Sequence, residues 1–252
     1  MDVLHANHIS KSYGKKKILG DIHLHLADGE LVCILGVSGV GKTTLFNILS
    51  GLILPDSGSV ELADENGVFR DISGETGHLS YMLQKDMLLP HKTILNNVAL
   101  PLVLKGMKAR EAGEIARPYF AQFGLEGTEN KYPAQLSGGM RQRAALLRTY
   151  LGSQGVALLD EPFSALDTIT KGQIHTWYLE VMEKIQLSTL LITHDIDEAI
   201  LLSDRVCILT GSPGVIKDEI RILPPRKERN NFGLTQEFLG YKKQILQILA
   251  RQ

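Results

Sequence analysis

Hydrophobic residues recur along the chain with two different periods. Short apolar runs predict strands, and apolar positions repeating every three or four residues predict helices. Strands are expected over residues 3–9, 18–26, 31–35, 60–62, 78–83, 156–159, 189–192 and 205–209, and helices over 109–123, 139–151, 170–185 and 195–202, with one more starting at residue 42. This alternation predicts an α/β protein with a parallel sheet and crossover helices. The first two strands, joined by a turn at residues 12–14, predict N-terminal antiparallel strands beside that sheet.

The middle and the end of the chain depart from this alternation. Residues 85–151 contain helical runs and almost no strand signal, so we interpret them as a helical subdomain inserted into a domain that spans residues 1–223. Pro224-Pro225 closes that domain. In residues 224–252, apolar residues recur at helical spacing and predict a basic C-terminal tail helix; they are Leu234, Phe238, Tyr241, Ile245 and Leu249.

Composition narrows the class of protein. With 252 residues, 44% hydrophobic and 22% charged, the chain can bury a large core, which excludes a mainly disordered protein. The net charge of −1 gives no global basic field for nucleic acid, although residues 221–252 hold seven of the 27 basic residues. No apolar run approaches the roughly 18–20 residues of a membrane span. The two cysteines lie in apolar runs typical of core thiols, so we expect a cytoplasmic protein whose membrane role comes through partners.

A glycine-rich loop follows the expected strand at 31–35. It fits the pattern G-x-x-x-x-G-K-[ST] between a buried strand and a helix, and its residues are Gly36, Val37, Ser38, Gly39, Val40, Gly41, Lys42 and Thr43, followed by Thr44. Backbone N–H groups of such a loop point at phosphate oxygens, Lys42 neutralises phosphate charge, and the Thr43 hydroxyl can bind Mg²⁺. The motif predicts a P-loop NTPase core of the RecA-like type that binds a nucleoside triphosphate with magnesium.

Four polar residues stand at the ends of other expected strands. Asp160 and Glu161 close the run at 156–159, where Asp160 is placed to hold the magnesium shell and Glu161 to polarise a water for attack on the γ-phosphate. Gln84 and His194 follow two further strands and could reach the metal, the water or the γ-phosphate. Taken singly, each of the four fits a cap, turn or surface role; the phosphate-binding loop on the same sheet favours the functional interpretation.

A second anion site is predicted at Ser137, Gly138 and Gly139, which open a helix containing three arginines. A hydroxyl and several N–H groups are exposed at such a helix start. Either the chain binds two separate anions, or two copies meet head to tail so that the loop of one and the Ser137 turn of the other clamp one triphosphate.

This set of motifs resembles the ATP-binding cassette (ABC) ATPases, in the family's order across residues 1–210. The resemblance implies that Glu161 is the catalytic base, that Asp160 and Gln84 serve magnesium and water, that His194 contacts the γ-phosphate, and that residues 137–139 act in trans. It also implies that Tyr13 stacks on adenine, with a plain turn residue as the alternative, and that Asp167 couples the two sites.

Several short segments are similar, more narrowly, to importer subunits for nitrate, sulfonates and taurine; they are residues 84–90, 93–102, 193–199, 202–205, 212–214 and 223–226. The similarity implies that ATP hydrolysis powers uptake of a small solute through a separate permease at the inner face of the cell membrane, with a solute-binding protein as an indirect partner. His91 stands where such sequences often carry Trp, near the surface that receives the permease. An importer of a thiamine-precursor pyrimidine is an alternative.

Other functions remain open from the residues alone. A non-transport ATP clamp of the same fold is one alternative. A GTPase or kinase is another, although Asn130-Lys131-Tyr132-Pro133 has Pro where a guanine-reading motif needs Asp, and a non-enzymatic nucleotide sensor is a third. His23 and His25 lie on the face of a strand opposite Ile22 and Leu24. We interpret both as solvent-facing, with a metal site as the alternative.

Overall fold

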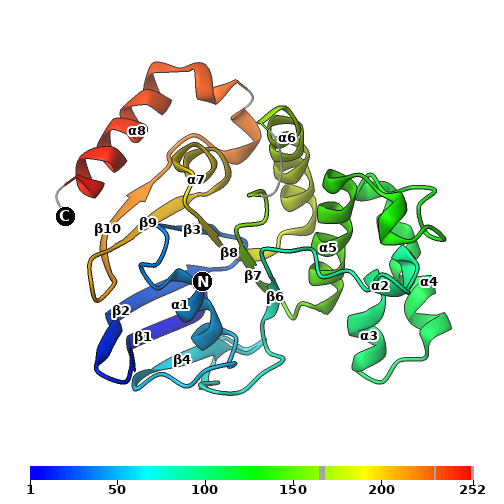
Figure 1. The fold of residues 1–252 in the computed structure, drawn as a ribbon, viewed down its shortest axis with the longest axis horizontal. Helices are drawn as coiled ribbons and strands as arrows, with labels where there is room; N and C mark the ends of the chain where they lie inside the picture. The colour runs from blue at the N-terminus through cyan, green and yellow to red at the C-terminus, as the bar shows by residue number, and fades with distance from the viewer. Residues whose placement is uncertain (165–167, 230, 251–252) are drawn as a thin grey trace.

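The computed structural model describes residues 1–164, 168–229 and 231–250, which form two sheets and a lobe of helices (Figure 1). An antiparallel sheet has the order β2 (Lys16–Ala27), β1 (Asp2–Tyr13), β4 (Ser57–Ala63) and β5 (Phe69–Asp71). A second sheet has the order β10 (Val215–Arg221), β9 (Arg205–Thr210), β3 (Leu31–Leu35), β8 (Ser188–Thr193), β7 (Val156–Asp160) and β6 (Ser80–Met82). Its strands are parallel except for β10, which pairs antiparallel with β9.

The side chains of β3 show how the second sheet acquires two buried faces. Leu31, Cys33 and Leu35 belong to one hydrophobic cluster, whereas Val32 and Ile34 belong to the other. A strand buried on both faces is apolar throughout, which is why this segment reads as a continuous hydrophobic run. One face packs on α1 (Lys42–Leu49) and the antiparallel sheet, and the other on α6 (Thr168–Ile185), α7 (Ile196–Leu202) and α8 (Gln236–Leu249).

The helical lobe lies between β6 and β7 in the chain and is green in Figure 1. It contains α2 (Ile94–Val98), α3 (Leu100–Leu104), α4 (Ala109–Gln122) and α5 (Gly138–Gly152). The fully buried Asn97 holds the turn before α2, because its amide donates to the carbonyls of Leu89, Lys92 and Thr93. Its oxygen in turn accepts the N–H of Leu89, so the turn enters the lobe with its polar groups satisfied.

Most expected elements are confirmed, and the differences have local causes. β1 runs through Tyr13, so the hairpin turn lies at residues 14–15 rather than 12–14, with Gly14 at φ 60°. β4 begins at Ser57, three residues before the strand expected at 60–62, and Gly58 adopts φ 93° against β1. The expected pattern lacks β5, which is very short, and β10, an edge strand whose exposed positions are charged.

The segment after residue 223 packs on the core. Phe238, Ile245 and Ile248 of α8 are buried, and Lys242 pairs with Asp197 of α7 at 2.6 Å. Arg229, which is 3% exposed, donates to the carbonyls of the last turn of α7 and thereby satisfies groups that a helix end leaves unpaired. Within the three described stretches, none of the helices combines the length and the hydropathy needed to span a bilayer.

Candidate active site

The glycine-rich loop follows β3 and packs against β2 and the end of β9. A Cβ on Gly36 would lie 2.5 Å from the carbonyl oxygen of Leu209, so a side chain there would collide with backbone. Gly41 has φ 112°, and a Cβ there would lie 2.7 Å from Leu19. Only glycine fits both positions, and the loop keeps the curled shape that phosphate binding requires.

Lys42 sits inside this curl. Its side chain is 6% exposed, and its Nζ donates to the carbonyl oxygens of Gly36 at 2.6 Å and Val37 at 3.1 Å. Burial lowers the pKa of Lys42, and the neighbouring carboxylates of Glu161 and Asp160 counteract only part of that shift. The cation is thus held at the centre of the loop, where the charge of a bound phosphate would be neutralised.

The side-chain oxygens of Asp160 and Thr43 lie close together near Lys42. The Thr43 hydroxyl lies 3.4 Å from Asp160 Oδ2, and the Tyr81 hydroxyl donates to the same oxygen at 3.2 Å. Burial raises the pKa of Asp160, whereas the bond from Tyr81 lowers it. This donor set is the kind that Mg²⁺ prefers, so the residues present fit a magnesium ion.

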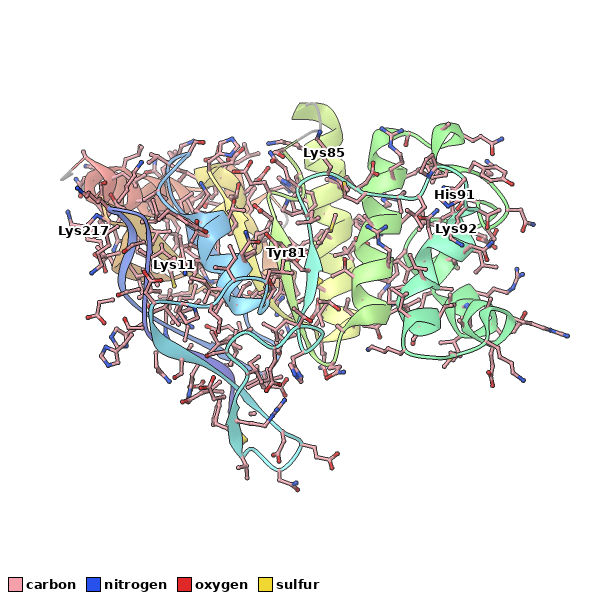
Figure 2. All side chains as sticks on the ribbon, turned by 60° about the horizontal axis from the view of Figure 1, so that its bottom comes forward. Lys11, Tyr81, Lys85, His91, Lys92 and Lys217 are labelled. Atoms are coloured by element: carbon pink, nitrogen blue, oxygen red, sulfur yellow. The ribbon has the colours of Figure 1, made fainter. Side chains whose placement is uncertain are left out.

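Tyr81 is a site residue that the sequence interpretation missed. It lies on β6, opposite Leu158 of β7 in the parallel ladder, near the middle of the molecule (Figure 2). Burial and the nearby Asp160 raise the pKa of Tyr81, so its hydroxyl keeps a proton to donate. Its only available signal was its place in the strand expected at residues 78–83, which did not indicate a contact with Asp160.

Glu161 lies at the centre of the site and is close to three of its other residues. It has φ 45°, a left-handed backbone that is uncommon for a residue with a side chain, and its N–H donates to the Ile192 carbonyl at 2.9 Å. Its carboxylate lies 3.1 Å from His194 Nδ1 and accepts from Gln84 Nε2 at 3.3 Å. Lys42 Nζ is 4.0 Å away. The structure therefore brings together residues that the sequence places at the ends of three separate strands.

A buried ionic network fixes the turn that carries His194. Glu198, 2% exposed, accepts from Thr193 Oγ1 at 2.7 Å and pairs with Lys171 Nζ at 2.8 Å, with His175 3.7 Å away. Burial alone would raise the pKa of Glu198, but its bonds to His175, Lys171 and Thr193 outweigh burial and lower the pKa to about 2. The charged form of this carboxylate is therefore favoured in the folded protein.

We expect Glu198→Gln to lower the free energy of unfolding at neutral pH by about 1–3 kcal/mol, because Lys171 loses its buried counter-charge. The folded pKa of Glu198 is depressed, so its contribution is complete above the ordinary value of 4.5 and is lost as pH falls toward about 2. Urea unfolding at several pH values should show the difference between wild type and variant shrinking across that window. Glu183→Gln, an exposed change on α6, the helix that carries Lys171, is the control; a pH-independent difference would contradict the linkage.

The Ser137 turn begins α5 on the other side of the Gln84 segment. Ser137 is exposed, and its Oγ accepts the N–H of Met140 at 3.3 Å as an N-cap. Arg141 of α5 bonds to the carboxylate of Asp86 at 3.1 Å, and Arg148 donates to the carbonyls of Asp86 and Met87. The residues that follow Gln84 are thus tied to the helical lobe.

Two cavities meet at Glu161 and His194. One, of about 410 Å³, is lined by Gly36, Val37 and Ser38, and the other, of about 690 Å³, by Gln84, Gly138 and Arg141; Glu161 and His194 line both. Among the described residues, no hydrogen bond joins the Ser137 turn to the glycine-rich loop. Within one chain the two predicted anion sites line different cavities, which share Glu161 and His194.

The remaining predicted contacts lie at the edge of the site. Tyr13 is 50% exposed at the end of β1, with Lys11 Nζ 5.9 Å from its ring centroid. It lines neither cavity, but its hairpin partner β2 supplies Ile18 and Leu19 against Gly41. Asp167 lies outside the described residues.

A parallel sheet with this loop after β3 defines a P-loop nucleotide-binding protein. Residues 19–164 match the ABC transporter family. The chain is 40% identical over 254 residues to the formylaminopyrimidine import ATP-binding protein ThiZ of Halalkalibacterium halodurans, covering 100% of this chain and 98% of that protein. It is 38% identical over 218 residues to the taurine import ATP-binding protein TauB of Escherichia coli K12, covering 86% and 84%. The chain belongs to the ABC transporter family.

Solved structures agree with this assignment. The dimeric structure of MJ0796, a bacterial ABC transporter cassette, superposes with a TM-score of 0.72 and 28% identity over 88% of this chain and 100% of that one. The same cassette is also known as a dimer in a post-hydrolysis state bound to ADP and Pi, with a TM-score of 0.71. The predicted fold and the predicted class of ATPase are confirmed, and the GTPase, kinase and nucleotide-sensor alternatives are not supported.

Proposed function

We propose that this chain is the ATP-hydrolysing subunit of an ABC importer, that it works as a head-to-tail dimer at the inner face of the cell membrane, and that it powers uptake of a small solute through a separate permease. The observation that carries the proposal is that the Glu161 carboxylate contacts Gln84 and His194 beside the Lys42 loop. The importer relatives support the direction of transport, and a solute-binding protein would deliver the solute from outside.

The site has the parts that ATP hydrolysis requires. Residues 36–44 would hold the phosphates through backbone N–H groups, while Lys42 transfers its bonds from the loop carbonyls to phosphate oxygens. Glu161 accepts the proton of a water whose oxygen attacks the γ-phosphorus in line; the bond to the bridging oxygen breaks and ADP leaves. His194 hydrogen-bonds the γ-phosphate, and Tyr13 stacks on adenine. Thr43, Asp160 and Gln84 would hold Mg²⁺, which would supply charge neutralisation at the phosphates.

A second copy completes the nucleotide site in this proposal. Ser137, Gly138 and Gly139 present a hydroxyl and a helix N-terminus on the surface, and Gly138 lines a different cavity from the loop of its own chain. A two-fold pair would place these residues of one copy over the triphosphate of the other and create two equal sites. The dimeric cassette relatives support this arrangement, and Asp167 would couple the two sites.

A groove on the helical lobe is the surface we propose for the permease. It has a volume of about 600 Å³, is lined by Tyr81, Met87, Leu100, Pro101, Leu104 and Arg148, and leaves Met87 56% and Leu104 79% exposed. Arg148 joins the groove to the backbone after Gln84, so an occupant that moves would shift the Gln84 segment. His91 and Lys92 are labelled on the same lobe in Figure 2, and His91 is exposed.

Leu104→Glu is expected to leave ATP turnover of the purified protein unchanged and to lower ATP-driven uptake at least about tenfold, because a charge would be buried against the permease. The measurement is solute uptake by vesicles that carry the membrane subunits expressed with this chain, using taurine and formylaminopyrimidine as the two candidate solutes. Leu234→Glu, an equally exposed leucine on the far C-terminal segment, is the matched control. Full uptake by the Leu104 variant would overturn this permease surface, and binding to no permease would leave the non-transport ATP clamp as the function.

A further inference from the structure

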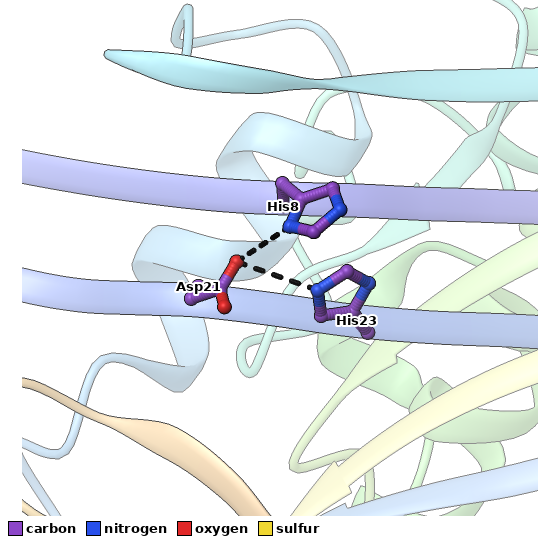
Figure 3. A group of neighbouring side chains, drawn as sticks. All are labelled: His8, Asp21 and His23. Carbon is purple, nitrogen blue, oxygen red and sulfur yellow. Dashed lines mark hydrogen bonds and ion pairs between the residues drawn. The ribbon is translucent and has the colours of Figure 1, made fainter.

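A group of metal-ligating side chains lies on the antiparallel sheet, outside the nucleotide site. His8 comes from β1, and Asp21 and His23 come from β2 (Figure 3). The Nδ1 of His8 is 2.8 Å and the Nε2 of His23 is 3.3 Å from the same Asp21 oxygen. The two imidazole rings meet edge to face with their centroids 3.9 Å apart. The candidate ligand atoms all lie within 4.8 Å of one another.

Two β-bulges bring these residues together. Between the pairs Ala6–Leu24 and Ile9–Ile22, β1 has two residues opposite the single residue His23, and one of them is His8. Between the pairs Ile9–Ile22 and Lys11–Leu19, β2 has the extra residue, and Asp21 belongs to that stretch. A bulge changes the direction in which a strand points its side chains.

The backbone at both bulges is left-handed, with φ 54° at His8 and at Asp21. The Ser10 hydroxyl accepts the N–H of Asp21 at 3.0 Å and fixes the second bulge. Ile9 and Ile22, the pair between the bulges, are fully buried. The core therefore anchors the sheet on one side while His8, Asp21 and His23 converge on the solvent side, each more than half exposed.

The donor set distinguishes this group from the nucleotide site. Two imidazole nitrogens and one carboxylate oxygen suit Zn²⁺, Ni²⁺ or Cu²⁺, whereas Mg²⁺ prefers oxygen ligands such as those beside Lys42. The bond from His8 lowers the pKa of Asp21, so the carboxylate is ionised at neutral pH. Among the described residues, no other group of three such side chains has its ligand atoms this close together.

We propose that His8, Asp21 and His23 bind one divalent transition-metal ion of the Zn²⁺ class through His8 Nδ1, His23 Nε2 and the Asp21 carboxylate. Three protein ligands leave at least one coordination position for water. The ion would cross-link β1 to β2 at the two bulges and replace the shared bonds to Asp21. This site is independent of ATP and of the proposed function.

The test is a titration of the full chain, with any affinity tag removed, with ZnCl₂ in excess Mg²⁺ by isothermal calorimetry. Wild type should bind one equivalent of Zn²⁺, and Asp21→Asn and His23→Gln should each weaken binding at least about tenfold. Cu²⁺ bound to wild type should show two coordinating nitrogens by electron paramagnetic resonance, and His23→Gln should reduce this to one.

His5→Gln is the matched control. His5 lies on the same strand β1 and bonds to a single carboxylate, Asp2, at 3.1 Å, so its loss should leave Zn²⁺ binding unchanged. Absence of stoichiometric binding in wild type would overturn the proposal. Equal binding by wild type, Asp21→Asn and His23→Gln would also overturn it. Thermal unfolding in EDTA would show that all variants fold alike, since the substituted side chains are exposed.

Discussion

We expect Glu161→Gln to bind ATP and to hydrolyse it about 10²–10⁴-fold more slowly than wild type, which is the usual contribution of a general base. Glutamine keeps the size of the side chain and can still contact Gln84 and His194, but it cannot accept the proton of the attacking water. Phosphate binding depends on the loop around Lys42, which the substitution leaves in place. The measurements are phosphate release for turnover and equilibrium binding of ATP.

Glu183→Gln is the control for this substitution, because it makes the same chemical change at an exposed position of α6. It should hydrolyse ATP at the wild-type rate. If Glu161→Gln did so too, the left-handed carboxylate at the centre of the site would be a structural residue, and another group would have to activate the water.

The second large expected effect is on the ATP-dependent assembly of two chains into a dimer. With hydrolysis blocked by Glu161→Gln, Mg-ATP should convert the 27.8 kDa chain to a dimer of twice that mass, and adding Ser137→Arg should abolish the dimer. The exposed Ser137 hydroxyl and the adjacent helix start would face the triphosphate of the other copy, and an arginine would fill that space. Loss of the N-cap by itself costs about 1 kcal/mol, too little to unfold α5. Light scattering with and without nucleotide gives the mass.

Ser153→Arg is the matched control, since it places the same side chain at the opposite end of α5. This variant should dimerise normally. A Ser137→Arg protein that still dimerises with ATP would show that the interface uses another surface. A Glu161→Gln protein that binds ATP but stays monomeric without membrane subunits would show that the isolated chain does not assemble the composite site.

The linkage between the helical lobe and Gln84 explains how a permease would influence hydrolysis. Arg141 and Arg148 of α5 hold the Asp86 and Met87 region, and Gln84, two residues earlier, contacts Glu161. A shift of α5 caused by a partner in the groove would therefore reach the Glu161 carboxylate through one short segment. The sequence showed the arginines on a helix, but their partners, the carboxylate of Asp86 and the carbonyls of Asp86 and Met87, became visible only in the fold.

Residues that occupy a fixed place relative to a strand end were the ones the sequence could identify. The glycine-rich loop and Asp160-Glu161 can be identified from the local sequence, because each follows a buried strand directly and the elements around it come in a fixed order along the chain. Tyr81 had no such signal. It acts on Asp160 only because β6 pairs with β7, a contact between segments 79 residues apart.

The strands also differ in whether the sequence alone predicts them. Burial on both faces made Leu31–Leu35 a continuous apolar run, so this strand was predicted with correct bounds. β10 has three exposed charged residues in a row, Lys217, Asp218 and Glu219, at a sheet edge and resembles a polar loop. Its place beside β9 follows from hydrogen bonds to another strand, which no local period encodes.

The sequence by itself determined the class of protein, the phosphate-binding loop and the order of its motifs, because these depend on local backbone geometry and on patterns of burial. Only the tertiary structure decided the strand order, the contacts of Glu161 with Gln84 and His194, and the different cavities that Gly138 and the loop line. It also decided the convergence of His8 with Asp21 and His23, where two opposed bulges override the strict alternation that a strand pattern assumes. Each of these depends on contacts between distant segments, and their free energy comes from packing the whole core rather than from any one stretch of chain.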